Sequence, residues 1–291
     1  MDNSVTIFIG SKRRMTRVVR EMIISKITRQ KELKDRYNIF THKNGKDEYA
    51  FSVDETILVK YQLRKGMELD SLLLNEIQYN DEIRKGYHRA VKYISSVKRT
   101  VAEVESHLSS KLENKALVSE VIAKLKEMKF LDDEDYAYSY VRTQRNTTSK
   151  GPEVIKRELR EKGIAEPLIL AAMEELSYED QIEAAVRLAV KFLDSKKKES
   201  SRIILQKLEQ MLVRKGYTSD IIRDVKNAPE VQAFDNDELA ALRVQGEKAR
   251  RKYGKYTDYE FTQKMKQFLY RKGFTMELIE QYLNELEMEM E

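Results

Sequence analysis

Hydrophobic positions recur with helical spacing over most of the chain beyond residue 81. Phe261, Met265, Phe268 and Leu269 lie at i, i+4, i+7 and i+8, which places them on one face of an α-helix. The same spacing, complete or shortened, recurs in three earlier sets: Ile204, Leu208, Met211 and Leu212; Val101, Val104 and Leu108; Ile155 and Leu159. The pattern predicts amphipathic helices that each bury one face.

A Leu-x-x-Lys element ends each of these helices. It occupies residues 108–111, 159–162, 212–215 and 269–272, so its leucines are 51, 53 and 57 residues apart. Three of the four elements continue into a glycine, at Gly163, Gly216 and Gly273. A glycine just after the last turn is typical of the left-handed C′ position, and the lysine complements the helix dipole. Substitution of Gly163 by Ala is therefore expected to cost ~1 kcal/mol.

The elements divide the chain into repeats of three helices. Third helices are expected from Leu168 to Leu176, from Ile221 to Val225 and from Leu278 to Leu286, and acidic segments at 132–135 and 235–238 open two of the repeats. Units of this size cannot bury a hydrophobic face alone, so they stack. The sequence therefore predicts a mainly α fold of tandem three-helix repeats in a curved solenoid, after a small N-terminal domain that contains a β-hairpin.

Residues 22–54 show the two-residue alternation of β-strands. Apolar and polar positions alternate around Ile39 and again around Phe51, and Asn44-Gly45 lies between the two runs. Asn-Gly adopts the positive φ angles of a type I′ turn, which predicts a hairpin. Asp54 is expected to cap a following helix and Gly66 to end it. A single hairpin is marginal without helical cover.

These patterns give six segments. They are a tail at 1–21, a small β-containing N-terminal domain at 22–80, and helical repeats at 81–130, 131–178, 179–231 and 232–291.

Composition narrows the class of protein. The 291 residues include 54 Lys and Arg against 49 Asp and Glu, and no Cys. The absence of Cys excludes disulfide scaffolds, thiol catalysis, Fe–S clusters and Cys-type zinc sites, and it suits a reducing cytoplasm. No uncharged apolar run approaches the ~18 residues of a membrane span, and the apolar residues 5–9 are too few for a secretory signal.

The net charge of +5 is distributed unevenly. Residues 84–115, 136–164, 187–215 and 243–272 contain eight, seven, nine and ten basic residues, each against three acidic ones. Residues 273–291 contain six Glu and no Lys or Arg. Each repeat is thus basic in its first and second helices, which can align as a stripe that fits a phosphate backbone or an acidic groove. The alternative interpretation is a solvated face.

Aromatic residues lie beside these cations, namely Tyr93, Tyr140, Phe192 and Tyr253. They can stack on bases or pack inside the three-helix units, and the sequence favours packing for any single ring.

Motifs for catalysis or metal binding are absent from the sequence. It contains no P-loop of the form GxxxxGKS/T, no GxGxxG after a strand, and no nucleophile–base pair in a motif context. His42, His88 and His107 lack metal-ligand spacing. The aspartates of 132–135 precede a helix, so helix capping explains them better than a metal does. We therefore expect no enzyme, no metal and no cofactor.

Several motifs in order resemble the RecX family. In the second repeat they are 130–137 (FLDDEDYA), 140–142 (YVR), 150–152 (KGP), 155–159 (IKREL) and 162–164 (KGI). In the last repeat they are 249–254 (ARRKYG) and 266–274 (KQFLYRKGF), and in the N-terminal domain 49–54 (YAFSVD) and 63–66 (LRKG), as in longer Gram-positive members. The resemblance spans residues 22–290. Four features depart from the family pattern: the 1–21 tail, Ser149-Lys150 in place of Gly-Tyr, an additional third repeat, and a first repeat without its glycine.

The resemblance implies a non-enzymatic regulator of the RecA recombinase in the cytoplasm. Such a protein binds the RecA–DNA filament along its groove and inhibits filament growth, ATPase, strand exchange and the SOS response. The implied partners are the RecA filament and single- and double-stranded DNA, with no membrane, and the chain is expected to be a monomer. The alternatives are a stand-alone nucleic-acid-binding repeat protein and a helical adaptor.

Twelve cations are the candidates for contact with phosphates and filament carboxylates. They are Arg142, Lys150, Lys156, Arg157, Arg160, Lys191, Lys207, Lys215, Arg250, Arg251, Lys252 and Lys272.

Overall fold

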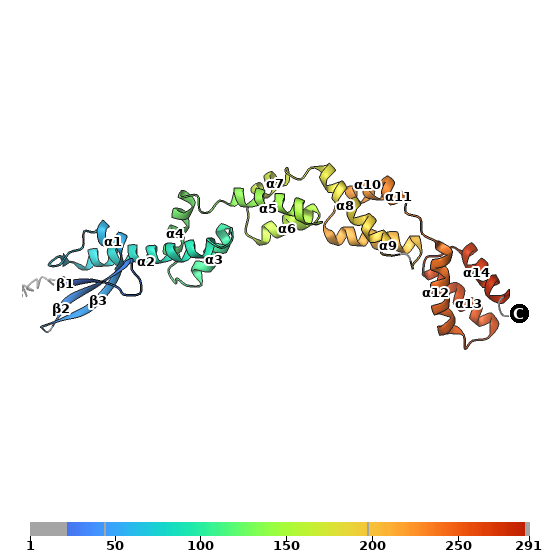
Figure 1. The fold of residues 1–291 in the computed structure, drawn as a ribbon, viewed down its shortest axis with the longest axis horizontal. Coiled ribbons are helices and arrows are strands. Elements are labelled where there is room, and N and C mark those ends of the chain that lie inside the picture. Colours follow the sequence, from blue (N-terminus) through green and yellow to red (C-terminus); the bar gives the residue numbers. More distant parts are fainter. Residues whose placement is uncertain (1–21, 44, 197, 289–291) are drawn as a thin grey trace, which may run out of the picture. The chain divides into compact units, whose positions relative to one another are not determined.

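The computed structural model describes residues 22–43, 45–196 and 198–288 (Figure 1). The expected tail at 1–21 lies outside the described residues, as does Asn44 of the expected turn. The described chain forms two compact units. The first contains residues 22–97 and 104–130, and the second contains 98–103 and 131–288.

The first unit begins with an antiparallel sheet. Its strands are β1 (Met22–Arg29), β2 (Arg36–Lys43), β3 (Lys46–Asp54) and β4 (Glu68–Leu69), in the order β3-β2-β1-β4. The predicted hairpin is confirmed as β2–β3, where Lys43 pairs with Lys46 and Gly45 has φ +76°. The sequence pattern predicts only this hairpin, whereas β1 and β4 complete a four-stranded sheet.

Helix α1 (Glu55–Lys60) lies between β3 and β4, and α2 (Ser71–Ile94) and α4 (Lys115–Glu127) come later in this unit. Helix α3 (Val101–Ser109) begins in the second unit, at residues 101–103, and its remaining residues belong to the first. Ile24 and Ile39 from the sheet, Ile57 from α1 and Ile77 from α2 are buried in one core. The helices thus supply the cover that a hairpin alone lacks. Helix α2 is continuous through residues 80 and 81, where the sequence pattern placed the boundary between the N-terminal domain and the first helical repeat.

One of the two caps predicted for α1 is correct. Asp54 is the N-cap, and its carboxylate accepts a hydrogen bond of 2.9 Å from the Thr56 amide. The prediction that Gly66 ends this helix is wrong, because α1 ends at Lys60 and Gln62 takes the positive φ of +49°. Gly66, at φ +83°, lies in the following loop, where its amide donates to the Ile24 carbonyl at 2.8 Å.

Two buried carboxylates join the sheet to α2. Asp81 of α2 forms an ion pair of 2.8 Å with Arg36 of β2 and accepts the Asp54 amide at 2.8 Å. Asp54 in turn pairs with Arg84 at 3.3 Å and with His88 at 3.1 Å. Because buried charges are tolerated only when they are paired, this network fixes where the sheet contacts α2.

The second unit contains three sets of helices. They are α5 (Asp133–Thr147), α6 (Pro152–Glu161) and α7 (Glu166–Met173); α8 (Tyr178–Asp194), α9 (Ser201–Lys215), α10 (Ser219–Asn227) and the short α11 (Pro229–Gln232); and α12 (Glu238–Tyr253), α13 (Asp258–Arg271) and α14 (Met276–Met288). Each set has its own hydrophobic core. The mainly α fold of tandem three-helix repeats after a small β-containing domain is confirmed.

The predicted core positions of the middle helices are buried. Leu159 of α6, Leu212 of α9 and Leu269 of α13 each have 0% exposure. The glycines that follow, Gly216 and Gly273 among them, adopt the predicted left-handed conformation, with φ from +78° to +87°.

The middle helices of successive repeats meet end to end. The hydroxyl of Thr100, which precedes α3, donates to the Lys162 carbonyl at the end of α6 at 2.7 Å. The Ser200 hydroxyl before α9 donates in the same way to the Lys272 carbonyl after α13 at 2.6 Å. At the junction between them, the Gly151 amide before α6 donates to the Lys215 carbonyl of α9. The terminal carbonyls of one helix thus meet the amino end of the helix in the preceding repeat, where the two helix dipoles attract.

A carboxylate closes two of the three junctions. Asp133, the first residue of α5, accepts the Val101 amide at 2.9 Å, and Glu238, the first residue of α12, accepts the Ser201 amide. At the remaining junction, the residue of α6 that corresponds to Val101 of α3 and Ser201 of α9 is Pro152. Proline has no amide hydrogen to donate, so a carboxylate would have no partner at this position. There the Glu153 amide donates to the Gly216 carbonyl at 3.1 Å.

Candidate nucleic-acid interface

The twelve predicted contact cations all lie in the second unit. Arg142 is on α5; Lys150 precedes α6, which carries Lys156, Arg157 and Arg160; Lys191 is on α8; Lys207 and Lys215 are on α9; Arg250, Arg251 and Lys252 are on α12; and Lys272 follows α13.

The arginines of the second repeat are engaged by carboxylates. Arg142 makes two hydrogen bonds to Glu175, at 2.7 and 3.0 Å, and Arg160 makes two to Glu166, at 2.7 and 2.8 Å. These bonds raise the pKa of both guanidinium groups and lower the pKa of both carboxyl groups. A phosphate that binds here must therefore compete with a bidentate carboxylate.

Lys150 is part of a smaller network within the same repeat. Its ammonium group lies 2.6 and 2.8 Å from the two oxygens of Glu158, and Glu158 also accepts the Tyr140 hydroxyl at 2.6 Å. Burial opposes ionisation of Glu158, but the bonds from Lys150 and Tyr140 outweigh it and lower its pKa. Burial and the bond to Glu158 raise the pKa of Tyr140.

Four more of the candidates have a carboxylate partner. The pairs are Lys156–Glu153 at 3.0 Å, Arg157–Glu161 at 3.8 Å, Lys207–Glu199 at 2.6 Å and Arg250–Glu247 at 3.7 Å.

The other five candidates are exposed and have no ion pair with any described residue: Lys191, Lys215, Arg251, Lys252 and Lys272. Lys252 lies 5.2 Å from the centre of the Tyr253 ring, and Lys272 lies 5.4 Å from that of Phe268. These contacts leave the ammonium groups open to anions. All five belong to the third and fourth repeats, so the structure separates the candidates into a paired set and an open set.

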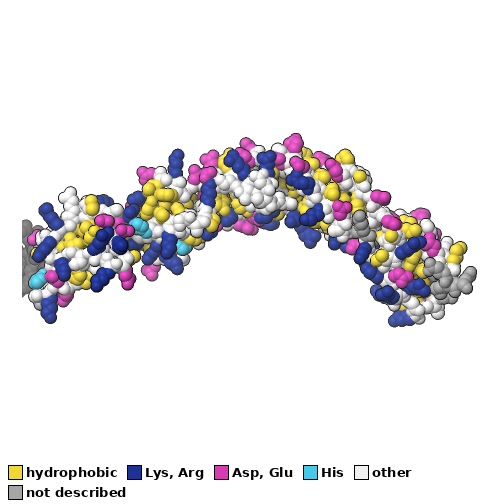
Figure 2. Space-filling model, in the orientation of Figure 1, with side chains coloured by type: hydrophobic (Ala, Val, Ile, Leu, Met, Phe, Trp, Pro, Cys, Tyr) yellow, Lys and Arg dark blue, Asp and Glu magenta, His cyan; other side chains and the backbone are white. Residues whose placement is uncertain are grey.

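Further open cations lie near this set. Lys248 is at the i−3 and i−4 positions of Arg251 and Lys252, so the three share one face of α12. Figure 2 shows Lys and Arg side chains over α12 and α13. Lys248 was not among the sequence candidates, although its helical spacing from Arg251 and Lys252 is a signal that could have included it.

The four rings beside the cations are engaged within the protein. Tyr93 stacks on His107 with ring centres 4.1 Å apart, and Tyr253 packs edge-on against Phe268. Tyr140 and Phe192 pack against the cores of their repeats. The packing alternative is therefore correct for these four rings.

The exposed rings are elsewhere. Tyr259 and Tyr270, both on α13, are 77% and 56% exposed. Neither tyrosine was among the four predicted rings. The two tyrosines are eleven residues apart, which is three helical turns, and this spacing indicates from the sequence that they share one face of a helix.

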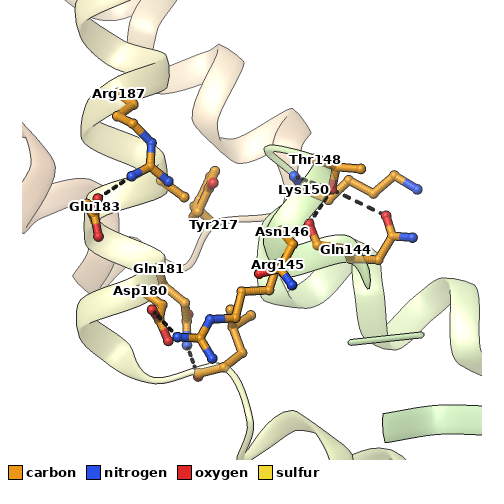
Figure 3. Close-up of a pocket in the computed structure, with 12 residues that line it drawn as sticks. Gln144, Arg145, Asn146, Thr148, Lys150, Asp180, Gln181, Glu183, Arg187 and Tyr217 are labelled. Carbon is orange, nitrogen blue, oxygen red and sulfur yellow. Dashed lines mark hydrogen bonds and ion pairs between the residues drawn. The ribbon is translucent and has the colours of Figure 1, made fainter. Parts of the chain in front are cut away.

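A polar pocket of about 290 Å³ lies between α5 and α8 (Figure 3). Its wall includes Arg145, which pairs with Asp180 at 2.8 Å, and Arg187, which pairs with Glu183. Tyr217, whose pKa is raised by burial, closes one side. Since both arginines are neutralised locally, the pocket attracts an anion only weakly.

The acidic segment that opens the second repeat has structural roles. Asp132 caps α5 through the Asp135 amide at 2.9 Å, and Asp135 pairs with Lys98. The capping interpretation is confirmed for Asp132. Among the described residues, no group of three or more His, Cys, Asp or Glu is placed to hold a metal ion.

Each of the three histidines has a carboxylate or an aromatic ring beside it. His42 lies 3.5 Å from Asp47, His88 lies 3.1 Å from Asp54, and His107 stacks on Tyr93. None of the helices in the described segments has the length and apolar character that crossing a membrane requires.

These features define a tandem three-helix repeat protein with a small N-terminal sheet domain and open cations on its last two repeats. Three family models match the chain: the N-terminal domain of the regulatory protein RecX at residues 22–70, the second RecX three-helix domain at 132–173, and the third RecX three-helix domain twice, at 179–225 and 236–283. The double match of the third domain corresponds to the additional repeat.

Full-length relatives agree. The regulatory protein RecX of Bacillus licheniformis is 45% identical over 90% of this chain and 98% of its own length, and that of Bacillus subtilis is 44% identical over 91% and 98%. A crystal structure of regulatory protein RecX superimposes with a TM-score of 0.62 at 37% identity, over 71% of this chain and 100% of that one. The chain belongs to the RecX family, which is a family of regulatory proteins and not of enzymes.

Proposed function

We propose that this protein regulates a RecA recombinase by binding along the RecA–DNA filament. In this proposal it inhibits filament growth, ATPase, strand exchange and the SOS response, and it acts without catalysis, as a monomer in the cytoplasm. Membership of the RecX family over about nine-tenths of the chain carries the proposal.

The open cations support this function. Lys215, Arg251, Lys252 and Lys272 are exposed and have no carboxylate partner within the described part of the chain. Such groups release counterions when they meet phosphates, which gives an affinity that depends on salt. The binding residues proposed here are the twelve candidates above, with the open set making the larger contribution and contacting single- or double-stranded DNA within the filament.

An assay with a cognate recombinase tests the proposal. Filaments are formed on single-stranded DNA, and ATP hydrolysis and strand exchange are followed as the protein is added. We expect inhibition at near-stoichiometric protein, and the absence of any modulation would contradict the proposal.

A charge-reversal pair separates this function from an adaptor. Arg250→Glu with Arg251→Glu should weaken inhibition, whereas an adaptor with an uncharged contact surface would be unaffected. Lys115→Glu with Lys126→Glu is the control, because both lysines are exposed on α4 and the charge change is the same. Equal binding to naked and recombinase-coated DNA would instead favour a stand-alone nucleic-acid binder.

A further inference from the structure

The middle helix of the last repeat presents two exposed tyrosines on one face. Tyr259 and Tyr270 are eleven residues apart on α13, which places them about 20° apart around the helix axis and about 16 Å apart along it. Neither hydroxyl has a hydrogen bond to a described residue, and neither ring contacts another aromatic ring of the described chain. Both rings are therefore available to an external partner.

The surface between the rings is polar. Helix geometry places Gln263, Lys266 and Gln267 on the same side of α13. Gln263 and Gln267 are exposed, and Lys266 pairs with Glu280 of α14 at 3.0 Å. Two flat rings that project from a polar surface are unlike the continuous apolar patch of a helix-docking site.

Cations lie near both ends of α13. Near the amino end, the ammonium groups of Lys255 and Lys264 lie 5.5 and 4.4 Å from the centre of the Tyr256 ring. At the carboxyl end, Arg271 follows Tyr270 in the sequence. Arg202 also lies near this end, because a Cβ built on Gly273 would lie 3.4 Å from the Arg202 Cβ. None of these four cations has an ion pair with a described residue. Rings flanked by open cations match the two parts of a nucleotide, a base and a phosphate.

The rings are particular to the fourth repeat. When the Leu-x-x-Lys elements are aligned, the positions of Tyr259 and Tyr270 are held by Arg202 and Val213 in the third repeat, and by Ser149 and Arg160 in the second. The common helix scaffold therefore does not require an aromatic residue at either position, and packing does not explain two exposed ones.

We infer that this face of α13 binds single-stranded nucleic acid, with Tyr259 and Tyr270 stacking on unpaired bases and the flanking cations contacting the phosphates. The inference rests on the proposed function, and it adds which surface contacts the strand and in which form. A duplex keeps its bases stacked on one another, so it offers these rings no free base face at internal positions. Stacking is tolerant of sequence because every base has a π-face.

The chain contains no Trp, which allows a direct test in the full-length protein. Tyr259→Trp and Tyr270→Trp each introduce a single indole, whose fluorescence is quenched when a base stacks on it. We expect quenching by an oligothymidylate and much less by a duplex of equal length at the same salt. Tyr49→Trp, at a 59% exposed position on β3, is the matched reporter and should not respond.

A second pair of variants measures the contribution to affinity. Tyr259→Leu with Tyr270→Leu keeps apolar side chains of similar size at exposed positions but removes the rings. Affinity for the oligothymidylate, measured by anisotropy of a labelled strand, should fall about five-fold or more, and affinity for the duplex should change little.

Three outcomes would overturn the inference. They are intact strand binding without quenching, an equal loss for single strand and duplex, and a reporter response to recombinase in the absence of nucleic acid, which would identify a protein partner. Quenching by free single strand together with no inhibition of the recombinase would support the inference and overturn the proposed function, so the two failures are distinguishable.

Discussion

At the scale of the residue, the glycine that follows three of the four Leu-x-x-Lys elements meets two separate requirements. Its positive φ follows from the end of the helix and was predictable from the motif. The second requirement is space, because a Cβ built on Gly163 would lie 2.3 Å from the Ala102 Cβ of the preceding repeat. That approach depends on residues 61 positions away in the sequence and was not predictable from the motif.

The two requirements can be separated by comparing two glycines. Gly45→Ala introduces a Cβ at φ +76° with no atom within 4 Å, so it should cost only the ~1 kcal/mol of backbone strain. Gly163→Ala adds a clash with a side chain that cannot rotate away, and should cost about 2–4 kcal/mol. Denaturant unfolding followed by hydrogen exchange in each unit measures both, and equal costs would show that the repeats separate easily at this junction.

At the scale of the element, the carbonyl end of one middle helix is satisfied by the next helix in space rather than by water. Ser200 shows how one side chain joins two helices at such a junction. Its side chain is 1% exposed, caps α9 through the Ile203 amide and donates to the Lys272 carbonyl. One hydroxyl therefore serves two helices.

Ser200→Ala should destabilise the second unit by about 1–2 kcal/mol, because it removes an N-cap and leaves the Lys272 carbonyl without this donor. Faster hydrogen exchange should be concentrated in the last turn of α13 and the first turn of α9. Ser195→Ala is the control, since that exposed hydroxyl bonds only the Phe192 carbonyl of its own helix end and its loss should matter little. An identical effect of the two variants would contradict the role of the junction.

The carboxylate network of the first unit predicts sensitivity to acid. Burial opposes ionisation of Asp54, but the bonds from Thr56 and the charge of Arg84 outweigh it and lower its pKa below the ordinary value of 3.8. A carboxyl group whose pKa is lowered by folding adds stability above its unfolded pKa of about 3.9 and loses it as the pH falls through the folded value.

Stability of the first unit should therefore decline as the pH falls below about 4–5, and Asp54→Asn should be less stable at neutral pH but decline less steeply. Hydrogen exchange of β2 and β3 amides between neutral pH and pH 3 measures this. Glu32→Gln, in an exposed turn, is the control and should follow the parent protein. A parallel decline in Asp54→Asn would show that other groups dominate.

At the scale of the whole molecule, paired and open cations should behave differently toward a polyanion. Lys215, Arg251 and Lys272 have no carboxylate partner in the described segments, whereas Arg142, Arg157 and Arg160 each have one. A cation already paired within the chain must leave its carboxylate before it can neutralise a phosphate and release the counterions of that phosphate.

Substituting the three open cations with Gln should reduce the slope of log K against log salt by about 0.7 for each lost phosphate contact on single strands. Substituting the three paired arginines changes the net charge equally but should alter this slope little. Titrations of labelled DNA or recombinase filaments at several salt concentrations give the slopes. Equal reductions would show that ion pairing within the chain does not govern which cations are used.

The sequence predicts the repeats, their helical faces, the caps at Asp54 and Asp132 and the left-handed glycines, because each depends on the spacing of residues within a few turns of one helix. Tertiary structure alone decided which cations are open, because Arg142 and Glu175 are 33 positions apart and come together only through packing. It also decided that Tyr253 is partly buried against Phe268 while Tyr259 is exposed, since exposure depends on which helix face meets the core of the repeat. Local patterns fix the elements, and long-range contacts select the groups left available for binding.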